Sequence, residues 1–281
     1  MLFFNSLFFI INKIFKNKSY RIKCFLKYKG YFILSIIGLI IIYSFINSFI
    51  IETTYVEVES EKIDEDLKIV SIADLHLGPI YGINYLDKIF DKIDLINPDI
   101  VIVSGDFVDG SGVYNFNLIN SFKNKTYPIY LTFGNHEIYA GDEYLNEIFN
   151  DVNINILRNE KIYYKNIQII GIDDSEDTNQ VYTNLKNISI DELNYSILLY
   201  HRPNGFIDAK NDKIDLMFSG HTHRGQIFPF SLFVKLAFPY IYGLYEYDGS
   251  YLYVTSGIAT WGPKLRFLSN NEIVVIDVLA K

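Results

Sequence analysis

Cysteine is nearly absent from this 281-residue chain, which contains one cysteine, one tryptophan, two methionines and five histidines. Because Cys24 has no second cysteine to pair with, an intramolecular disulfide and a thiolate metal cluster are both excluded. The chain also lacks the excess of basic residues that general nucleic-acid binding needs, since its formal net charge is −8. A metal site in this protein would therefore use nitrogen and oxygen ligands.

Charge is missing altogether from residues 30–51. This run is dominated by Ile, Leu and Phe and is long enough to cross a bilayer as a helix. A buried helix of a soluble protein is the alternative. Because no small-residue cleavage site follows the run, we expect an uncleaved transmembrane anchor rather than a signal peptide that is removed.

The charges on the two sides of this run differ in sign. Residues 1–29 form a basic segment, whereas four glutamates follow the run: Glu52, Glu57, Glu59 and Glu61. Positive residues stay in the cytoplasm, so we predict a single-pass cell-membrane protein with its main domain on the extracytoplasmic side. Residues 1–11 are apolar but too short to span, which indicates an interfacial helix. Residues 52–66 are predicted to be a short acidic tether.

Three strand-like runs in the first half of the remaining domain, residues 67–281, each end in a polar cluster. The runs at 67–73, 100–103 and 129–133 alternate with helical stretches at 85–96, 115–123 and 142–149. Such alternation predicts parallel β-α-β units, whose ligands bind beyond the carboxyl ends of the strands. A single aspartate at such an end is often only a helix cap. Three clusters together favour a site.

The second half of the domain is richer in strands. A hairpin is predicted from 161–165 and 167–172, with further strands at 196–200, 214–218, 251–255 and 272–279. We therefore expect an α/β protein in which two packed β-sheets are flanked by helices.

All five histidines follow strand-like runs: His76, His136, His201, His221 and His223. His221 and His223 stand two residues apart in a predicted turn flanked by Gly220 and Gly225, and where backbone is extended such residues project to the same side. A pair of surface histidines in a loop is the alternative. Together with Asp74, Asp106 and Asn135, the histidines form a set of nitrogen and oxygen donors. Such a set suits Mn, Fe, Zn or Co better than Ca.

These motifs resemble, in order, the signature of the calcineurin-like metallophosphoesterases. The residues that carry the resemblance are Asp74-x-His76, Gly105-Asp106-x-x-Asp109, Gly134-Asn135-His136-Glu137, His201 and Gly220-His221-x-His223. The resemblance implies a four-layer α-β-β-α sandwich over residues 67–281. The final motif is similar to that of a membrane-anchored branch, some of whose members cleave the pyrophosphate of UDP-2,3-diacylglucosamine.

The resemblance also implies two divalent metal ions, with Mn²⁺ as the first choice and Fe, Zn or Co as alternatives. Asp74, His76, Asp106 and His223 would hold one ion. Asp106, Asn135, His201 and His221 would hold the other, so that Asp106 bridges them. The predicted reaction is attack of metal-bound hydroxide on the phosphorus of a phosphodiester or pyrophosphate. His136 is the predicted catalytic residue, which stabilises the phosphoryl group or protonates the leaving oxygen; orienting Asp106 or a metal ligand is its alternative role.

Four further residues are weaker candidates. Arg202 and Arg224 are predicted to contact the substrate phosphate. Many members of the family carry an acidic residue at the position of Arg202, which leaves its role open, and a solvated surface arginine is the alternative for Arg224. Asp109 is expected to support its loop or a histidine ligand, with simple exposure to solvent as the alternative, and Glu137 has no assigned role.

The substrate is expected to be lipid-linked and held at the membrane. Residues 227–247 are apolar and contain Pro229 and Pro239, so they are expected to form a long loop that accepts acyl chains or touches the bilayer. A loop folded into the core is the alternative. A soluble nucleotide or a cell-wall polymer is the alternative substrate, and a non-catalytic metal-binding scaffold the alternative function. UDP-linked acyl sugars are made in the cytoplasm, so the predicted topology disfavours that one substrate. No protein partner can be inferred.

Overall fold

The computed structural model describes residues 19–111, 118–123, 125–149 and 152–281. It divides the chain into two units, residues 1–43 and residues 44–281. The predicted interfacial helix at residues 1–11 and the first part of the predicted helix at 115–123 lie outside the described residues.

The apolar run forms part of one long helix, α2 (Ser19–Asn47). Within α2, residues Lys27–Asn47 are long and apolar enough to cross a membrane, judged by length and composition. The helix ends at Asn47 rather than at the expected limit of 51. Ser44, Asn47 and Ser48 are polar and buried in the second unit, so the chain leaves the apolar run before Ile51.

The first sheet has the strand order β1-β12-β2-β3-β4-β5. Its strands are β1 (Ile51–Ser60), β12 (Asn271–Ala280), β2 (Leu67–Ile72), β3 (Ile100–Ser104), β4 (Ile129–Thr132) and β5 (Asn155–Ile156). β2, β3, β4 and β5 are parallel, whereas β12 runs antiparallel to β2. The predicted parallel β-α-β arrangement is thus confirmed.

Strand β1 corrects the expectation that residues 52–66 form a tether. It pairs in parallel with β12 over its whole length, from Ile51 opposite Asn271 to Ser60 opposite Ala280. Exposed and buried side chains alternate along this strand, since Glu57 and Glu59 are exposed and Val58 between them is buried. The glutamates made the segment look like an acidic tether instead. The sheet therefore begins directly after the end of the apolar helix.

The second sheet has the order β10-β11-β9-β8-β7-β6. Its strands are β6 (Glu160–Tyr164), β7 (Ile167–Ile172), β8 (Ser196–Tyr200), β9 (Leu216–Ser219), β10 (Gly243–Tyr247) and β11 (Ser250–Val254). The predicted hairpin is present as the antiparallel pair β6 and β7, with Tyr164 opposite Ile167. Strands β7, β8, β9 and β11 are parallel.

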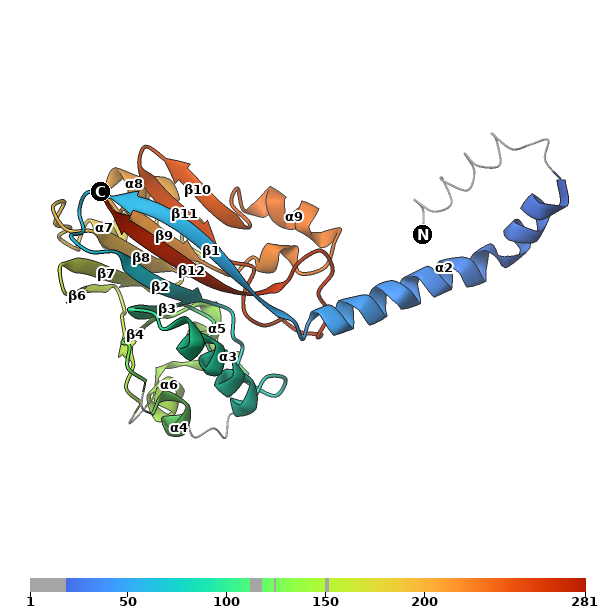
Figure 1. The fold of residues 1–281 in the computed structure, drawn as a ribbon, viewed down its shortest axis with the longest axis horizontal. Coiled ribbons are helices and arrows are strands. Elements are labelled where there is room, and N and C mark those ends of the chain that lie inside the picture. The colour runs from blue at the N-terminus through green and yellow to red at the C-terminus, as the bar shows by residue number, and fades with distance from the viewer. Residues whose placement is uncertain (1–18, 112–117, 124, 150–151) are drawn as a thin grey trace. The chain divides into compact units, whose positions relative to one another are not determined.

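Helices cover the outer faces of the two sheets (Figure 1). The helices α3 (Ile83–Ile96), α4 (Ile119–Phe122) and α6 (Asp142–Phe149) pack on the first sheet, and α7 (Gln180–Leu185) and α8 (Phe206–Asn211) pack on the second. Residues such as Ile69, Leu199 and Phe218 fill the space between the sheets. Each fully buried side chain of this kind contributes about 1.5–3 kcal/mol. The predicted four-layer α/β sandwich is confirmed.

Two helices near the site were not predicted. One is the short α5 (Asn135–Ala140), which begins inside the third polar cluster. The other is α9 (Phe230–Ala237), which lies in the segment expected to be a loop, residues 227–247. That expectation was wrong because the prolines flank the helix instead of interrupting it: Pro229 is its N-cap and Pro239 follows its end, and both positions tolerate proline.

Candidate metal centre

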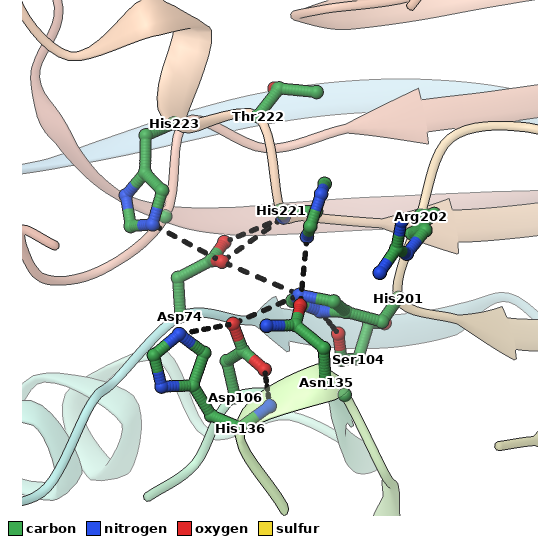
Figure 2. A network of polar contacts seen from close by, with 12 residues as sticks. Asp74, Ser104, Asp106, Asn135, His136, His201, Arg202, His221, Thr222 and His223 are labelled. Carbon is green, nitrogen blue, oxygen red and sulfur yellow. Dashed lines mark hydrogen bonds and ion pairs between the residues drawn. The ribbon is translucent and has the colours of Figure 1, made fainter. Parts of the chain in front are cut away.

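The carboxyl ends of five strands from both sheets meet at one place, and all seven predicted metal ligands lie there. Figure 2 shows six of them, and the seventh, His76, lies beside His223 and Asp106. Asp74 and His76 follow β2, Asp106 follows β3, Asn135 follows β4, His201 follows β8, and His221 and His223 follow β9. The structure thus brings together residues that are up to 149 positions apart in the sequence (from Asp74 to His223, 223 − 74).

Three overlapping groups of side chains place ligand atoms within 4.8 Å of one another. They are Asp74, His76 and His223; His76, Asp106 and His136; and Asp106, His201 and His221. The first and third groups correspond to the two ions that the resemblance implies. Asp106 belongs to the second and third groups, and the second group shares His76 with the first. The carboxyl group of Asp106 therefore lies close to ligands of both implied ions, as the predicted bridging role requires.

The distances within these groups are short. Oδ2 of Asp106 lies 3.0 Å from Nε2 of His201 and 4.0 Å from Nε2 of His76. Nε2 of His76 also lies 3.2 Å from Nε2 of His223. The two imidazole nitrogens therefore point at the same small volume, next to the carboxyl group of Asp106.

Asn135 lies beside His221 rather than in a group of its own. Its Oδ1 atom is 2.9 Å from Nδ1 of His221, and the ring of His221 packs edge-on against the ring of His201. The amide oxygen of Asn135 thus reaches the part of the centre that the family resemblance implies for it.

Five of the predicted ligands have a positive φ angle, a region that residues other than glycine rarely occupy. They are Asp74 (57°), His76 (47°), Asp106 (53°), His221 (67°) and His223 (47°). His221 and His223 lie in a turn, as the flanking glycines indicated, and both have left-handed rather than extended backbone conformations. Such conformations cost roughly 1–3 kcal/mol each and persist only where the surroundings hold them.

Two glycines allow the loops to approach this closely. A Cβ atom on Gly134 would lie 2.3 Å from Oδ1 of Asp106, and one on Gly220 would lie 2.4 Å from Oδ2 of Asp74. Because Gly220 has no side chain, the carboxylate of Asp74 can lie against the backbone there, and the N–H of His221 donates to its Oδ1 atom at 3.0 Å. The glycines of the two motifs are therefore needed for space.

Glu137 is the residue whose importance the sequence least revealed. Its fully buried carboxyl group accepts hydrogen bonds from the backbone N–H groups of Asp106, Val108 and Gly134, each at 2.8 Å. Burial raises the pKa of Glu137 to about 7. Glu137 thus ties the loop after β3 to the start of α5. Only its place in the Gly-Asn-His-Glu motif could have indicated this.

Burial keeps three of the imidazoles neutral. It lowers the pKa of His76 to about 4 and that of His221 to about 3, and it lowers the pKa of His223 as well. A neutral imidazole keeps the lone pair with which it binds a cation. Burial also raises the pKa of Asp74 to about 6.

Asp106 and His201 behave as an ion pair. Burial disfavours charge on both, but their mutual attraction outweighs it, so that the pKa of Asp106 is lowered and that of His201 is raised to about 10. Nδ1 of His201 donates to the carbonyl of Ser104 at 2.8 Å, which turns Nε2 toward Asp106. Nε2 of His201 would have to release its proton to bind a cation, as metal ligands generally do.

The residues present fit a pair of divalent metal ions. The buried Nε2 atom of His201 has no hydrogen bond of good geometry among the described residues, although it lies close to Asp106. The donors are imidazoles, carboxylates and one amide, a mixture typical of sites for Mn, Fe, Zn and Co. A cation between these groups would also offset the repulsion between the buried carboxylates of Asp74 and Asp106.

His136 lies at the edge of the centre. Its Nδ1 atom donates to the carbonyl of Asp109 at 2.6 Å, and its Nε2 atom is 3.9 Å from Oδ2 of Asp106. Its backbone N–H donates to Oδ1 of Asp106 at 3.0 Å. The main chain of Asp109 thus fixes the ring of His136.

The two predicted phosphate-binding arginines contact other side chains. Nε of Arg202 donates to both carboxylate oxygens of Asp174, at 2.9 and 3.0 Å, and the guanidinium of Arg224 stacks over the ring of Tyr242 at 4.2 Å. Neither side chain lines the cavity beside the centre. Their contact with substrate stays a prediction.

A cavity of about 760 Å³ opens directly onto the centre. One wall carries His136 and five of the seven candidate metal ligands: His76, Asp106, Asn135, His221 and His223. The other wall is apolar and comes largely from α9 and the segments around it, including Phe228, Phe230, Phe233, Phe238 and Trp261. The cavity thus joins the polar cluster to an aromatic surface.

Residues 67–225 of the chain match the family described as calcineurin-like phosphoesterase. An uncharacterized metallophosphoesterase of Campylobacter jejuni is 37% identical over 259 residues, which are 88% of this chain and 69% of that protein. One from Aquifex aeolicus is 30% identical over 253 residues, 85% of this chain and 96% of that protein. A Danio rerio protein named transmembrane protein with metallophosphoesterase domain is 30% identical over 250 residues, 79% of this chain and 56% of that protein. The chain thus spans from about half to nearly all of the length of these relatives.

Proposed function

The chain belongs to the calcineurin-like phosphoesterase family and is a metal-dependent phosphoester hydrolase; from this premise we propose that it cleaves a phosphodiester or pyrophosphate bond in a lipid-linked substrate. The observation that carries the proposal is the cavity, which has candidate metal ligands on one wall and exposed aromatic side chains on the other. A substrate with a phosphate group and an apolar chain would occupy both walls at once.

We assign the two metal positions to the seven residues predicted above, with Asp106 shared. When bound, two divalent cations, with Mn²⁺ as our first choice, supply Lewis acidity toward the phosphoryl oxygens and lower the pKa of a water molecule. Asp106 is held for this by its contact with His201 and by the backbone N–H of His136. These contacts orient the carboxyl group before any ligand binds.

His136 is the proposed catalytic residue outside the metal ligands. Its Nδ1 proton is held by the carbonyl of Asp109, and its ring lines the cavity. Nε2 is the atom that would carry a proton to the leaving oxygen or bond to the phosphoryl group. The backbone of His136 also orients Asp106, so the alternative orienting role belongs to its N–H group rather than to its ring.

The lipid part of the substrate is proposed to lie along α9. The described residues of α9 include none that is buried, and Phe230 and Phe233 are both 62% exposed although each lines the cavity. Large apolar surfaces left open to water mark binding sites for apolar ligands or membranes. We place the catalytic unit on the extracytoplasmic side because the basic residues near the apolar run precede it and glutamates follow it.

The experiment compares two substrates of the full chain in detergent micelles with added Mn²⁺. We expect kcat/KM for a long-chain lipid pyrophosphate to exceed that for a short-chain analogue with the same headgroup by about tenfold or more, since each buried methylene contributes roughly 0.8 kcal/mol. Equal values would favour a soluble nucleotide or polymer. No turnover of a chromogenic phosphodiester with any divalent metal would favour the scaffold. Protease accessibility on intact cells tests the side of the membrane.

A further inference from the structure

One buried arginine joins the candidate metal ligand His223 to the end of helix α2. The side chain of Arg266 is fully buried, and its Nη1 atom donates to the carbonyl of His223 at 3.2 Å. Nη1 also donates to Oγ of Ser269 at 2.7 Å, and that hydroxyl donates to the same carbonyl at 2.9 Å. The side chains of Arg266 and Ser269 therefore both donate to the main-chain carbonyl of His223.

The rest of the guanidinium is bound by the same part of the fold. Nη2 donates to the carbonyls of Gly257 and Ala259, at 3.2 and 2.5 Å, and Nε donates to Oδ1 of Asn271 at 2.9 Å. A buried guanidinium is tolerated only when its donors are satisfied, and these acceptors satisfy them. The position of Arg266 is thus closely determined.

The backbone of Arg266 is held in turn by the last turn of α2. Its N–H donates to the carbonyl of Ser44 at 2.9 Å, and Nδ2 of Asn47 donates to the carbonyls of Arg266 and Ser269, at 3.3 and 3.0 Å. Nδ2 of Asn271 donates to the carbonyl of Ser48 at 2.6 Å. Ser44, Asn47 and Ser48 are all buried, although they lie at the end of an apolar run that is otherwise mostly exposed.

We propose that Arg266 is a positioning residue for His223, and that the last turn of α2 (Ser44–Asn47) holds Arg266 in place. The end of the membrane helix is then part of the support of the metal centre. His223 needs such support because it and Arg224 both have positive φ angles, 47° and 52°, which the surroundings must maintain. Mutating a residue that hydrogen-bonds to a metal ligand, without touching the ion itself, commonly lowers the metal affinity by about 10–100-fold.

The inference rests on the proposed function only in taking His223 as a metal ligand. The test uses the full chain in detergent, stripped of metal, and measures Mn²⁺ binding by electron paramagnetic resonance of the free ion. Two variants break the connection at different points: Ser269→Ala beside His223, and Asn47→Ala at the end of α2. The control is Asn155→Ala, which removes an amide-to-carbonyl hydrogen bond to Ile129 at the amino end of β4.

We expect Ser269→Ala to weaken the binding of one of the two Mn²⁺ ions by about tenfold. Asn47 contacts the backbone of Arg266 and Ser269 but not His223, so we expect Asn47→Ala to weaken Mn²⁺ binding by a smaller factor, about fivefold. Asn155→Ala should bind both ions as the wild type does. The fluorescence of Trp261, the only tryptophan in the chain, checks that the segment around Arg266 stays folded.

A lower melting temperature with unchanged Mn²⁺ affinity in both variants would show that Arg266 stabilises the fold only, and would overturn the inference. If Ser269→Ala fails to fold, Asn47→Ala decides the question alone, because it touches no residue of the centre. Wild-type protein that binds no Mn²⁺ would contradict the proposed function itself, so the two failures are distinguishable.

Discussion

The carboxyl group of Glu137 accepts a hydrogen bond from the backbone N–H of Asp106 at 2.8 Å. The side chain of Asp106 lies among the candidate metal ligands, so Glu137 supports that loop from behind without joining the centre. Since Glu137 also binds the N–H groups of Val108 and Gly134, one side chain sets the distance between two of the motif loops.

Replacing Glu137 with Gln should destabilise the fold and slow the reaction. The amide would place an NH₂ group against a backbone N–H donor, leaving a buried group unpaired at a cost of about 1–3 kcal/mol. We expect a lower free energy of unfolding in urea and a fall of about tenfold in kcat/KM. Glu176→Gln, at an exposed position, is the control and should change neither. A Glu137→Gln variant with wild-type stability would mean that these hydrogen bonds contribute little.

The shared position of Asp106 predicts two different patterns of metal loss. Asp106→Asn should weaken the binding of both ions, because Oδ2 of Asp106 lies 4.0 Å from Nε2 of His76 and 3.0 Å from Nε2 of His201, which are proposed ligands of different ions. His201→Ala should weaken the binding of one ion. Metal content by mass spectrometry after dialysis against a fixed Mn²⁺ concentration measures both. Asp64→Asn, on the exposed surface, is the control. One ion retained at full affinity in Asp106→Asn would exclude the bridging role.

Two phenylalanines of α9 should matter only for lipid substrates. In the double variant Phe230→Ser and Phe233→Ser, turnover of a long-chain phosphate ester should fall by about tenfold or more, because each side chain offers roughly 1.5–3 kcal/mol of apolar contact. Turnover of a small soluble phosphodiester should be spared. Leu236→Ser is a matched control, since Leu236 lies on the same helix, is 85% exposed and does not line the cavity. An equal loss on both substrates would rule out the acyl-binding wall.

Glu272 is expected to be a stability residue. Its buried carboxyl group accepts hydrogen bonds from the hydroxyls of Thr54, Tyr253 and Thr255, at 2.6, 3.0 and 2.8 Å, and thereby joins β1 and β12 to β11 and the loop after it. Glu272→Ala should lower the free energy of unfolding by about 3 kcal/mol or more, because several donors lose one charged acceptor. Tyr253→Phe should cost less, and Tyr55→Phe, at an exposed position, should cost nothing measurable. Urea unfolding of the three variants would settle the order; if Glu272→Ala were as stable as wild type, the carboxyl group would not be holding the sheets together.

Most of the candidate centre could be read from local sequence. Residues 100–103 are apolar and β-branched, and such runs are each followed by a helix, so the pattern of residues along the chain was enough to locate parallel strands and their carboxyl ends. The candidate residues at those ends, Asp74 and His201 among them, could then be named. The strands could be located because their pattern depends on residues close together in the chain.

Local pattern suggested the wrong course of the backbone in two places. The alternation in β1 was hidden by glutamates, and the helix α9 was hidden between two prolines. β1 forms because β12 offers a free edge more than 200 residues later, a contact that no local pattern records.

By itself, the sequence determined the apolar span, the alternation of strands and helices along the chain, and the identity of the residues at the centre. Each of these is a property of side chains that are neighbours in the sequence. Only the tertiary structure decided which distant residues bond to the backbone of the centre, as Arg266 does to His223, and which ones join the sheets, as Glu272 does. Arg266 and Glu272 occur in no motif, and their partners lie as far away as Ser44 and Thr54. Hydrogen bonds between such distant positions leave no periodic trace in a sequence, so they become visible only when the chain is folded.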